Sequence, residues 1–331
     1  MTHRVGIIGY GVMGKIRHKV INELGDIAKV VAISEQFSKV ENNDIPNLTP
    51  EELISQENID VVIVCTPNHL NKEFTIKALN AGKHVFCEKP PAFTGADVLE
   101  IIAAEKASNK KLMYGFNHRH HDSIIHMKEL ISGGQYGNPL WARGRYGKSV
   151  TPDYFNQWRS QSKFAGGGIL MDQGIHMLDL FLYLLGDFDT VKAELSNLYW
   201  KMDVEDNAFV IMKDTRSGVV ASLHSTMTQW RHLFSLEIFL EKGYMVLNGL
   251  ITSSMTYGEE ELSVAKNRST APAATWKDEI KTKYTDNNSW RYEMEHFFSA
   301  IDNDKPVQIG NSEDAFKLMS LMDKIYQSKN V

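Results

Sequence analysis

The sequence predicts an α/β domain with a parallel sheet over residues 1–120, followed by an α+β domain with a mostly antiparallel sheet over residues 121–331. Three observations support this. In the first part, short apolar strands alternate with helices, which is typical of a parallel sheet covered on both faces. A glycine-rich turn follows the first strand. Beyond residue 190, strand-like segments follow one another without intervening helices, which indicates antiparallel pairing.

The first domain is expected to contain five strands and at least two helices. Each strand is a short run rich in valine and isoleucine, and glycines end the helices. The predicted strands cover residues 5–9, 30–34, 61–65, 84–87 and 111–114, and the helices cover 12–24 and 70–81.

The second domain begins with a helix near 123–132 and a strand at 140–146, and a further helix ends at Gly186. Turn signals then separate the strands predicted at 191–199, 207–213, 219–228, 236–240 and 244–247. Residues 253–288 are polar and should form short strands and loops. Two helices, at 290–302 and 312–328, are expected to close the domain.

Composition narrows the class of protein. The net charge of −5 and the absence of a lysine- or arginine-rich block argue against a nucleic-acid partner. Cys65 and Cys87 both lie at the ends of predicted buried strands, so we expect free thiols and a reducing compartment. We see no signal-peptide pattern and no apolar run near the ~20 residues that span a bilayer. We therefore expect a cytoplasmic protein that does not bind membranes.

The glycine-rich turn is the first candidate site. In Gly9-Tyr10-Gly11-Val12-Met13-Gly14, Gly9 permits the turn, Gly11 allows backbone amides to approach a diphosphate, and Gly14 allows close packing of helix and sheet. Glu35 ends the second strand, about 20 positions further on, where a carboxylate binds ribose hydroxyls and repels a 2′-phosphate. We therefore favour NAD over NADP, although Lys39 could reach a phosphate.

Two loops at the carboxyl ends of parallel strands form the second candidate site, because ligands of open α/β sheets bind at that edge. Thr66-Pro67-Asn68-His69 follows the third strand and could border the ribose and nicotinamide. Glu88-Lys89-Pro90 follows the fourth strand, where Glu88 could contact the cofactor and the Lys89 ammonium could stabilise an alkoxide. Asn117 follows the fifth strand and could contact the nicotinamide or the substrate.

The third candidate site is the segment from Gly166 to His176. Its glycine run could let a ligand approach the backbone. Asp172 and His176 then share one face of a helix, so the carboxylate could orient an imidazole that moves a proton. Asp179, further along the same face, lies among apolar residues and is more consistent with a structural hydrogen-bond acceptor.

In combination, these motifs resemble the Gfo/Idh/MocA oxidoreductases, a family that includes glucose–fructose oxidoreductase and inositol dehydrogenase. The resemblance rests on the segments 9–14, 66–68, 81–90, 115–119 and 167–179. It implies an amino-terminal Rossmann domain, a second domain with a large open sheet, a nicotinamide cofactor, and a homodimer or homotetramer formed through that sheet. It also implies that Lys89, Asp172 and His176 surround the reacting carbon. Relatives often carry histidine in place of Asn71, a position we expect to be peripheral.

Further side chains could contact a substrate. Arg119 follows the fifth strand, and Trp158 and Arg159 precede the glycine run, where a guanidinium could bind an anion and an indole could pack on a sugar. Tyr146 and Tyr154 are weaker candidates. A histidine-rich segment offers metal-ligand spacing, but we favour a solvated helix start and no metal. Its members are His118, His120, His121, Asp122 and His126.

The sequence therefore predicts a dehydrogenase or reductase that transfers a hydride between nicotinamide and a secondary alcohol or ketone of a sugar, a cyclitol or a nucleotide-linked sugar. Two alternatives remain open, because the same fold hosts different functions. One is a nucleotide-sensing protein that does not turn over, and the other is a reductase of a non-sugar substrate. Either Lys89 or His176 could transfer the proton.

Overall fold

The computed structural model describes residues 2–36, 45–268 and 270–328. It divides into two compact units. Unit 1 contains residues 1–117 and 289–320, and unit 2 contains residues 118–288 and 321–331. The first division lies close to the predicted boundary at residue 120, but the chain later returns to unit 1.

Unit 1 is built on a five-stranded parallel sheet with the strand order β2-β1-β3-β4-β5. The strands are short and apolar because helices exclude water from both faces, and Val61 to Val64 are fully buried. Their bounds are β1 His3–Ile8, β2 Ala28–Ser34, β3 Val61–Val64, β4 His84–Glu88 and β5 Leu112–Gly115. This sheet confirms the parallel α/β fold predicted for the first domain.

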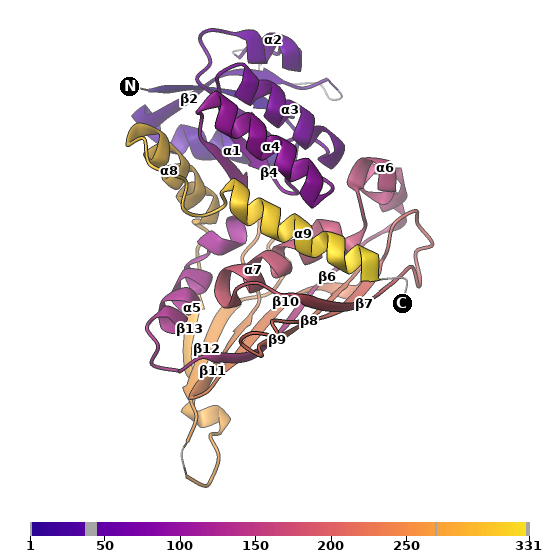
Figure 1. The fold of residues 1–331 in the computed structure, drawn as a ribbon, viewed down its shortest axis with the longest axis vertical. Helices are drawn as coiled ribbons and strands as arrows, with labels where there is room; N and C mark the ends of the chain where they lie inside the picture. The colour runs from indigo at the N-terminus through magenta and orange to yellow at the C-terminus, as the bar shows by residue number, and fades with distance from the viewer. Residues whose placement is uncertain (1, 37–44, 269, 329–331) are drawn as a thin grey trace. The chain divides into compact units, whose positions relative to one another are not determined.

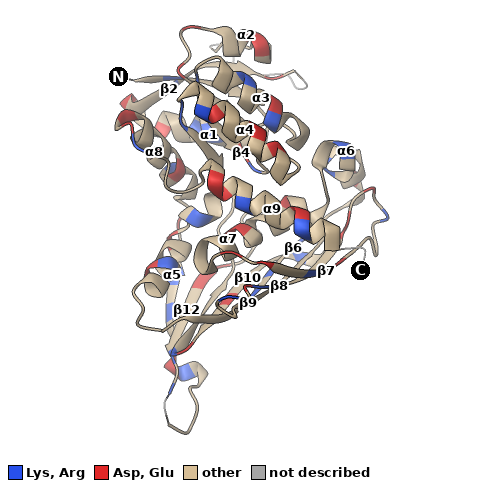
Figure 2. Cartoon of the chain, viewed as in Figure 1, with Lys and Arg blue, Asp and Glu red and all other residues tan. Residues whose placement is uncertain are grey.

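In the described residues, helices lie between successive strands of this sheet. They are α1 Val12–Glu23, α2 Pro50–Ser55, α3 Asn68–Asn80 and α4 Gly95–Ser108. Thr49 and Thr94 are the N-caps of α2 and α4, and each forms a capping box. The threonine side chain accepts a hydrogen bond from the backbone amide three residues on, and the acidic side chain of that residue accepts one from the threonine amide. Acidic and basic residues are interspersed along α3 and α4 (Figure 2), and Lys72 of α3 pairs with Asp97 of α4 at 2.7 Å.

Residues 289–320, where the chain returns to unit 1, complete the core of that unit. Helix α8, Ser289–Asp302, lies beside α1 (Figure 1) and contributes Phe297 and Phe298 to the core beneath the sheet. The amide of Tyr114 also donates to the carbonyl of Gly310 at 2.7 Å. The assignment of residues 289–320 to the second domain therefore differs from the structure, because their apolar faces pack on the first sheet.

Unit 2 contains an eight-stranded sheet with the order β13-β12-β11-β10-β6-β9-β8-β7. All of its pairs are antiparallel except β6 with β9. The chain between β6 and β9 crosses over through a helix, and such a connection gives parallel strands. The bounds are β6 Pro139–Ser149, β7 Thr190–Ser196, β8 Asn207–Lys213, β9 Val220–Thr226, β10 Thr228–Leu240, β11 Gly243–Asn248, β12 Glu260–Lys266 and β13 Ile280–Tyr284.

The helices of unit 2 are α5 Asp122–Ser132, the single turn α6 Ser162–Ala165, and α7 Ile175–Leu185. Helix α9, Ser312–Ser328, has its first part in unit 1 and its last residues in unit 2. Residues 162–185 meet the length and composition criteria for a membrane-spanning helix, with a mean hydropathy of 1.3, contrary to our expectation from the sequence. However, 72% of that apolar window is buried inside the protein, as in a core helix.

Candidate active site

The glycine-rich turn lies between β1 and α1 in unit 1. Gly9 adopts φ +87°, and a Cβ there would lie 2.5 Å from the carbonyl oxygen of Cys65. A Cβ on Gly14 would lie 2.2 Å from the carbonyl oxygen of Gly9. Both positions therefore require glycine for close backbone packing.

The turn also has the features of a diphosphate cradle. Among the described residues, none lies within 4 Å of a Cβ built on Gly11, so the space in front of it is open. Gly11 is the N-cap of α1 and has no side chain to cap its first amides. Val12 is 73% exposed, and Met13 is half-buried. Free space beside uncapped amides at a helix N-terminus suits an anionic diphosphate.

Glu35 lies directly beside this turn. Its carboxylate accepts a 3.0 Å hydrogen bond from the amide of Tyr10. Asn47 holds the Glu35 backbone by accepting from its amide at 2.9 Å and donating to its carbonyl at 3.0 Å. The carboxylate is thus fixed at the end of β2, where a ribose acceptor is required. Lys39, the residue that could reach a 2′-phosphate, lies outside the described residues.

Lys89 is half-buried, and Asn71 holds the backbone on both sides of it. The Asn71 amide donates to the carbonyl of Pro90 at 2.8 Å and to the carbonyl of Glu88 at 3.3 Å. Asn71 is fully buried, and its own oxygen accepts from the hydroxyl of Thr66 at 2.8 Å. The position we expected to be peripheral therefore fixes the segment that carries Lys89.

Glu88 takes part in a buried ion cluster, although the sequence suggested that it contacts a cofactor. Arg17 of α1 binds Glu88 at 2.7 Å and Glu293 of α8 at 2.8 Å. The Arg17 side chain is fully buried and lies 4.4 Å from the centre of the Phe86 ring. These contacts give Glu88 a structural role. Sequence reasoning missed Arg17 and Glu293 because they lie on helices far apart in the chain.

The other predicted residues of unit 1 are placed as follows. Pro67 is the N-cap of α3, Asn68 begins that helix, and His69 is exposed. Asn117 follows β5 and donates to the hydroxyl of Ser289 at 3.3 Å. All of these residues lie after the carboxyl ends of β3 or β5, at the edge where such sheets bind ligands.

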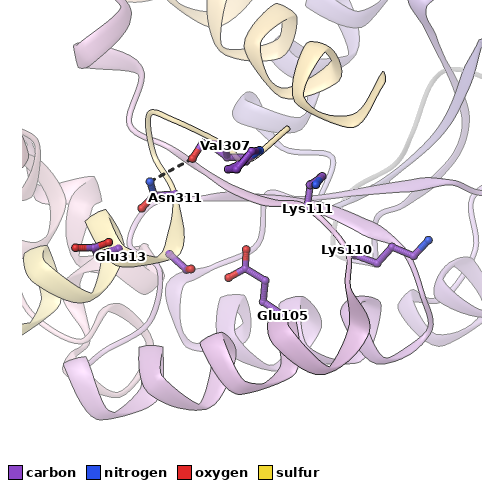
Figure 3. A pocket seen from close by; sticks show the side chains of 8 residues that line it. Glu105, Lys110, Lys111, Val307, Asn311 and Glu313 are labelled. Carbon is purple, nitrogen blue, oxygen red and sulfur yellow. Dashed lines mark hydrogen bonds between the residues drawn. The ribbon is translucent and has the colours of Figure 1, made fainter. Parts of the chain in front are cut away.

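A pocket of about 360 Å³ lies elsewhere in unit 1 (Figure 3). None of the predicted site residues lines it. Its walls consist of Glu105, Lys110, Lys111, Pro306, Val307, Asn311, Ser312 and Glu313. We do not assign it to the cofactor or the substrate, because it lacks the glycine turn and the candidate proton-transfer groups.

In unit 2, Asp172 is paired with Lys148. The Lys148 ammonium donates to the Asp172 carboxylate, and the Arg159 guanidinium lies 3.9 Å from its other oxygen. Lys148 also lies 4.8 Å from the centre of the Tyr154 ring. Two cations therefore lie within ion-pair distance of the Asp172 carboxylate, and Lys148 is a candidate site residue that the sequence analysis did not identify.

The backbone around Asp172 departs from a regular α-helix. Residues Leu170–Gly174 form a π-helical turn, and α7 begins at Ile175. Such turns are often found at functional sites. Because Asp172 is engaged by Lys148, its proposed orientation of His176 remains a prediction.

His176 is 7% exposed and stacks on His118, with ring centroids 3.9 Å apart and planes inclined by 17°. His118 Nε2 and the Tyr146 hydroxyl are hydrogen-bonded at 2.9 Å. Burial, with nearby Tyr257 and Asp172, raises the pKa of Tyr146 well above its usual value. Tyr146 therefore stays protonated and can donate a hydrogen bond within this buried group.

The glycine run before Asp172 serves packing and not ligand access. A Cβ on Gly167 would lie 2.0 Å from the Tyr326 hydroxyl, and a Cβ on Gly168 would lie 1.9 Å from the Glu205 carbonyl oxygen. Tyr326 also donates to Glu205 at 3.1 Å. The end of α9 and the segment before β8 therefore occupy the space that we expected a ligand to use.

Arg119 is 3% exposed and forms a two-pronged ion pair with Asp179, at 2.9 and 2.7 Å. This geometry favours a structural role for both residues, as anticipated for Asp179 but not for Arg119. Trp158 and Arg159 are half-buried, and the guanidinium lies 4.4 Å from the centre of the indole. Arg159 thus remains a candidate for substrate contact.

The histidine-rich segment does not converge on one point. His121 is 3.1 Å from Glu260, and His126 is 2.7 Å from the hydroxyl of Tyr284. Within the described part of the chain, no three His, Cys, Asp or Glu side chains gather as a metal site would require. His118 instead belongs to the group that contains His176.

Comparison with known proteins places the chain in a family. Residues 3–116 match the family described as "Oxidoreductase family, NAD-binding Rossmann fold", and residues 124–246 match the "GFO/IDH/MocA C-terminal domain". Levoglucosan dehydrogenase of Pseudarthrobacter phenanthrenivorans is 35% identical over 58% of this chain and 53% of its own length. The chain thus aligns with only about half the length of that relative. D-glucoside 3-dehydrogenase of Escherichia coli is 26% identical over 98% of this chain and 95% of its own length.

Solved structures agree with this placement. The structure titled levoglucosan dehydrogenase in complex with NADH and levoglucosan has a TM-score of 0.87 and 26% identity, over 99% of this chain and 97% of that chain. The similarity extends over both units, and the family descriptions match the region of each candidate site. This chain therefore belongs to the Gfo/Idh/MocA oxidoreductase family and carries its NAD-binding Rossmann domain.

Proposed function

We propose that the protein is a nicotinamide-dependent oxidoreductase that interconverts a secondary alcohol and a ketone on a sugar or cyclitol. One observation carries the proposal: the parallel sheet that bears the glycine turn after β1 also presents Lys89 after β4. Relatives named for levoglucosan, D-glucosides and inositol support this substrate class.

The cofactor, when bound, supplies or accepts the hydride, and the side chains handle the proton and the developing charge. In the oxidation direction, the Lys89 ammonium binds the substrate oxygen and stabilises it as the alkoxide develops. His176 accepts the hydroxyl proton as general base, assisted by Asp172. Direct proton transfer by Lys89 is the alternative, and comparison of the two single variants distinguishes them.

The support for NAD over NADP is the position of Glu35. Its carboxylate lies at the end of β2 within hydrogen-bond distance of the Tyr10 amide, at the glycine turn. A carboxylate there accepts from both ribose hydroxyls and repels a 2′-phosphate.

We further propose a homodimer or homotetramer formed through the eight-stranded sheet. In support, the outer face of this sheet exposes large apolar side chains, including Phe209 at 51% and Ile211 at 56%, and clusters of such side chains mark interaction surfaces. On the same face, Trp141 stacks on Phe239 with centroids 4.1 Å apart. Ile211→Glu should weaken assembly in analytical ultracentrifugation, while a chain that is monomeric from the start would exclude this interface.

Turnover tests the function directly. A panel of polyols, sugars, glycosides and nucleotide sugars is incubated with NAD or NADP, and NADH or NADPH fluorescence reports oxidation. We expect oxidation of at least one neutral sugar or cyclitol. Lys89→Met should abolish it without changing NADH affinity, and His176→Ala should lower kcat by about two to four decades. Binding of NADH without turnover of any substrate would instead indicate a nucleotide sensor.

A further inference from the structure

We propose that unit 2 carries a second sugar subsite beside Asp172, which holds the neighbouring ring of a glycoside while its other ring is oxidised. The subsite is an aromatic platform, formed by Phe155, Tyr199, Trp200 and Trp230. This inference names the substrate class of the proposed oxidoreductase as glycosides of two or more rings, and it rests on that proposed function.

The platform is a surface cluster of aromatic rings. Trp230 is 59% exposed, Tyr199 58% and Phe155 44%. Tyr199 lies 5.0 Å from Trp230 and 5.1 Å from Trp200 between ring centroids, with the planes nearly perpendicular in both pairs. Exposed apolar clusters of this kind mark binding sites more often than ordinary surface.

Two features hold the rings in place before any ligand arrives. Asp206 is fully buried, and its carboxylate accepts hydrogen bonds from the amides of residues 198, 199 and 200 at 2.8–2.9 Å. The Trp200 indole also donates to the carbonyl of Met227 at 3.2 Å. The loop that carries Tyr199 and Trp200 is therefore rigid, which lowers the entropic cost of binding.

The strand that carries Trp230 is distorted at the platform. Where β10 pairs with β6, Thr228 lies opposite Ser149 and Leu233 lies opposite Gly147. Four residues of β10, 229–232, therefore lie opposite one residue of β6, Lys148. Trp230 adopts φ +57° within this bulge, an uncommon conformation for an aromatic residue. Bulges of this kind redirect side chains near functional sites.

A continuous set of contacts connects the platform to Asp172. Trp200 packs on the buried cluster that contains Tyr154. The Tyr154 ring lies 4.8 Å from the ammonium of Lys148, and Lys148 is paired with Asp172. The Tyr154 hydroxyl is buried without a hydrogen-bond partner among the described residues. The platform is therefore one layer of side chains away from Asp172.

The chemistry of these groups suits a sugar ring. The C–H faces of a pyranose pack on aromatic rings, while its hydroxyls require donors and acceptors at the edge. The platform supplies the aromatic faces. The half-buried Arg159 guanidinium, which lies 3.9 Å from the Asp172 carboxylate, supplies a hydrogen-bond donor.

The test compares one-ring and two-ring substrates. Steady-state kinetics are measured with glucose and methyl glucoside, and with cellobiose and maltose, for the parent, Trp230→Gly and Tyr199→Ala. Glycine tolerates the positive φ of residue 230, so this variant removes the ring without straining the backbone. Trp276→Ala is the matched control, because Trp276 is an aromatic residue that is 83% exposed and lies in neither the platform nor the proposed oligomer interface.

We expect each platform variant to lower kcat/KM for the favoured disaccharide about 10-fold and to leave the one-ring sugars within about twofold. Trp276→Ala should change neither value. Equal losses for both substrate types would overturn the subsite. A change in oligomeric state with unaltered disaccharide kinetics would show that the platform is a subunit interface.

A binding measurement separates this proposal from the proposed function. Quenching of tryptophan fluorescence by cellobiose, measured with NADH bound, requires no turnover. Quenching that is lost in Trp230→Gly supports the subsite even if no sugar is oxidised. An enzyme that oxidises sugars, but whose fluorescence and disaccharide kinetics do not change in the variants, has no such subsite.

Discussion

The side-chain amide of Asn71 donates a 2.8 Å hydrogen bond to the backbone carbonyl of Pro90, the residue that follows Lys89. The same amide reaches the carbonyl of Glu88, so both neighbours of Lys89 are held by one buried side chain. A lysine that binds a developing alkoxide must be placed accurately, and this contact supplies part of that accuracy.

Replacing Asn71 with alanine should therefore lower kcat about 10- to 100-fold, because buried carbonyls lose their partner and the Lys89 segment loosens. The dissociation constant for NADH, measured by fluorescence, should change less than about threefold. Asn80→Ala, at the exposed end of α3, is the matched control and should be neutral. Asn71→His tests whether histidine, the residue that the family resemblance suggests at this position, supports activity. Full activity of Asn71→Ala would contradict the positioning role.

Arg17 should be essential for the stability of unit 1. It is fully buried between Glu88 and Glu293, so Arg17→Met leaves two buried carboxylates without their cation. We expect the free energy of unfolding in urea to fall by about 3–5 kcal/mol. Lys19→Met, at an exposed position on the same helix, should cost less than about 0.5 kcal/mol. If Arg17→Met lowers the free energy of unfolding by less than about 1 kcal/mol, the ion cluster does not stabilise unit 1 to the extent expected.

Asn71 and Arg17 show which interactions could not be predicted from the sequence alone. The strands of unit 1 and the glycine turn were predictable, because apolar runs and glycine spacing are local signals. Arg17 and Asn71 gave no such signal. Their partners come from other elements, and only the packed sheet brings β4 beside α1 and α3.

Lys148 is a different case, because the sequence contained a signal for it. The strand predicted at 140–146 continues to Ser149 in the structure. Since side chains alternate along a strand, Lys148 falls on the same face as Tyr146. The parallel pairing of β6 with β9 was not predictable from a row of strands without helices, because it depends on the crossover through α7.

Lys148 should position Asp172 for the proton-transfer role that we propose for Asp172 and His176. In Lys148→Met, Asp172 loses its closest cation, and we expect kcat to fall about 10- to 100-fold. Lys148→Arg keeps the charge and should retain more activity than the methionine variant. Lys163→Met, at an exposed lysine, is the control. If all three variants turn over at the parental rate, the Lys148–Asp172 pair is incidental.

Glu35 should determine the choice of cofactor. Without its carboxylate, the enzyme loses hydrogen bonds to the ribose and no longer repels a 2′-phosphate. Glu35→Ala should therefore reduce the ratio of kcat/KM for NAD to that for NADP by about 10- to 100-fold. Gln36→Ala, at the exposed neighbouring position, should leave the ratio unchanged. A parent enzyme that uses both cofactors equally would refute this assignment.

His84 should make unit 1 less stable in acid. Burial, together with the nearby charge of Lys110, lowers its pKa to about 4, and its Nδ1 accepts from the Lys111 amide at 3.1 Å. As the pH falls, the His84 ring is therefore protonated near pH 6.5 in the unfolded chain but only near pH 4 in the folded chain. The contribution of His84 to stability is complete above pH 6.5 and is lost as the pH falls toward 4. Because the ring is only half-buried, we expect this contribution to be about 1–2 kcal/mol. Urea denaturation between these pH values should show a steeper loss for the parent than for His84→Asn, whose amide oxygen can still accept from Lys111. Parallel pH profiles for the two proteins would exclude His84 as the responsible group.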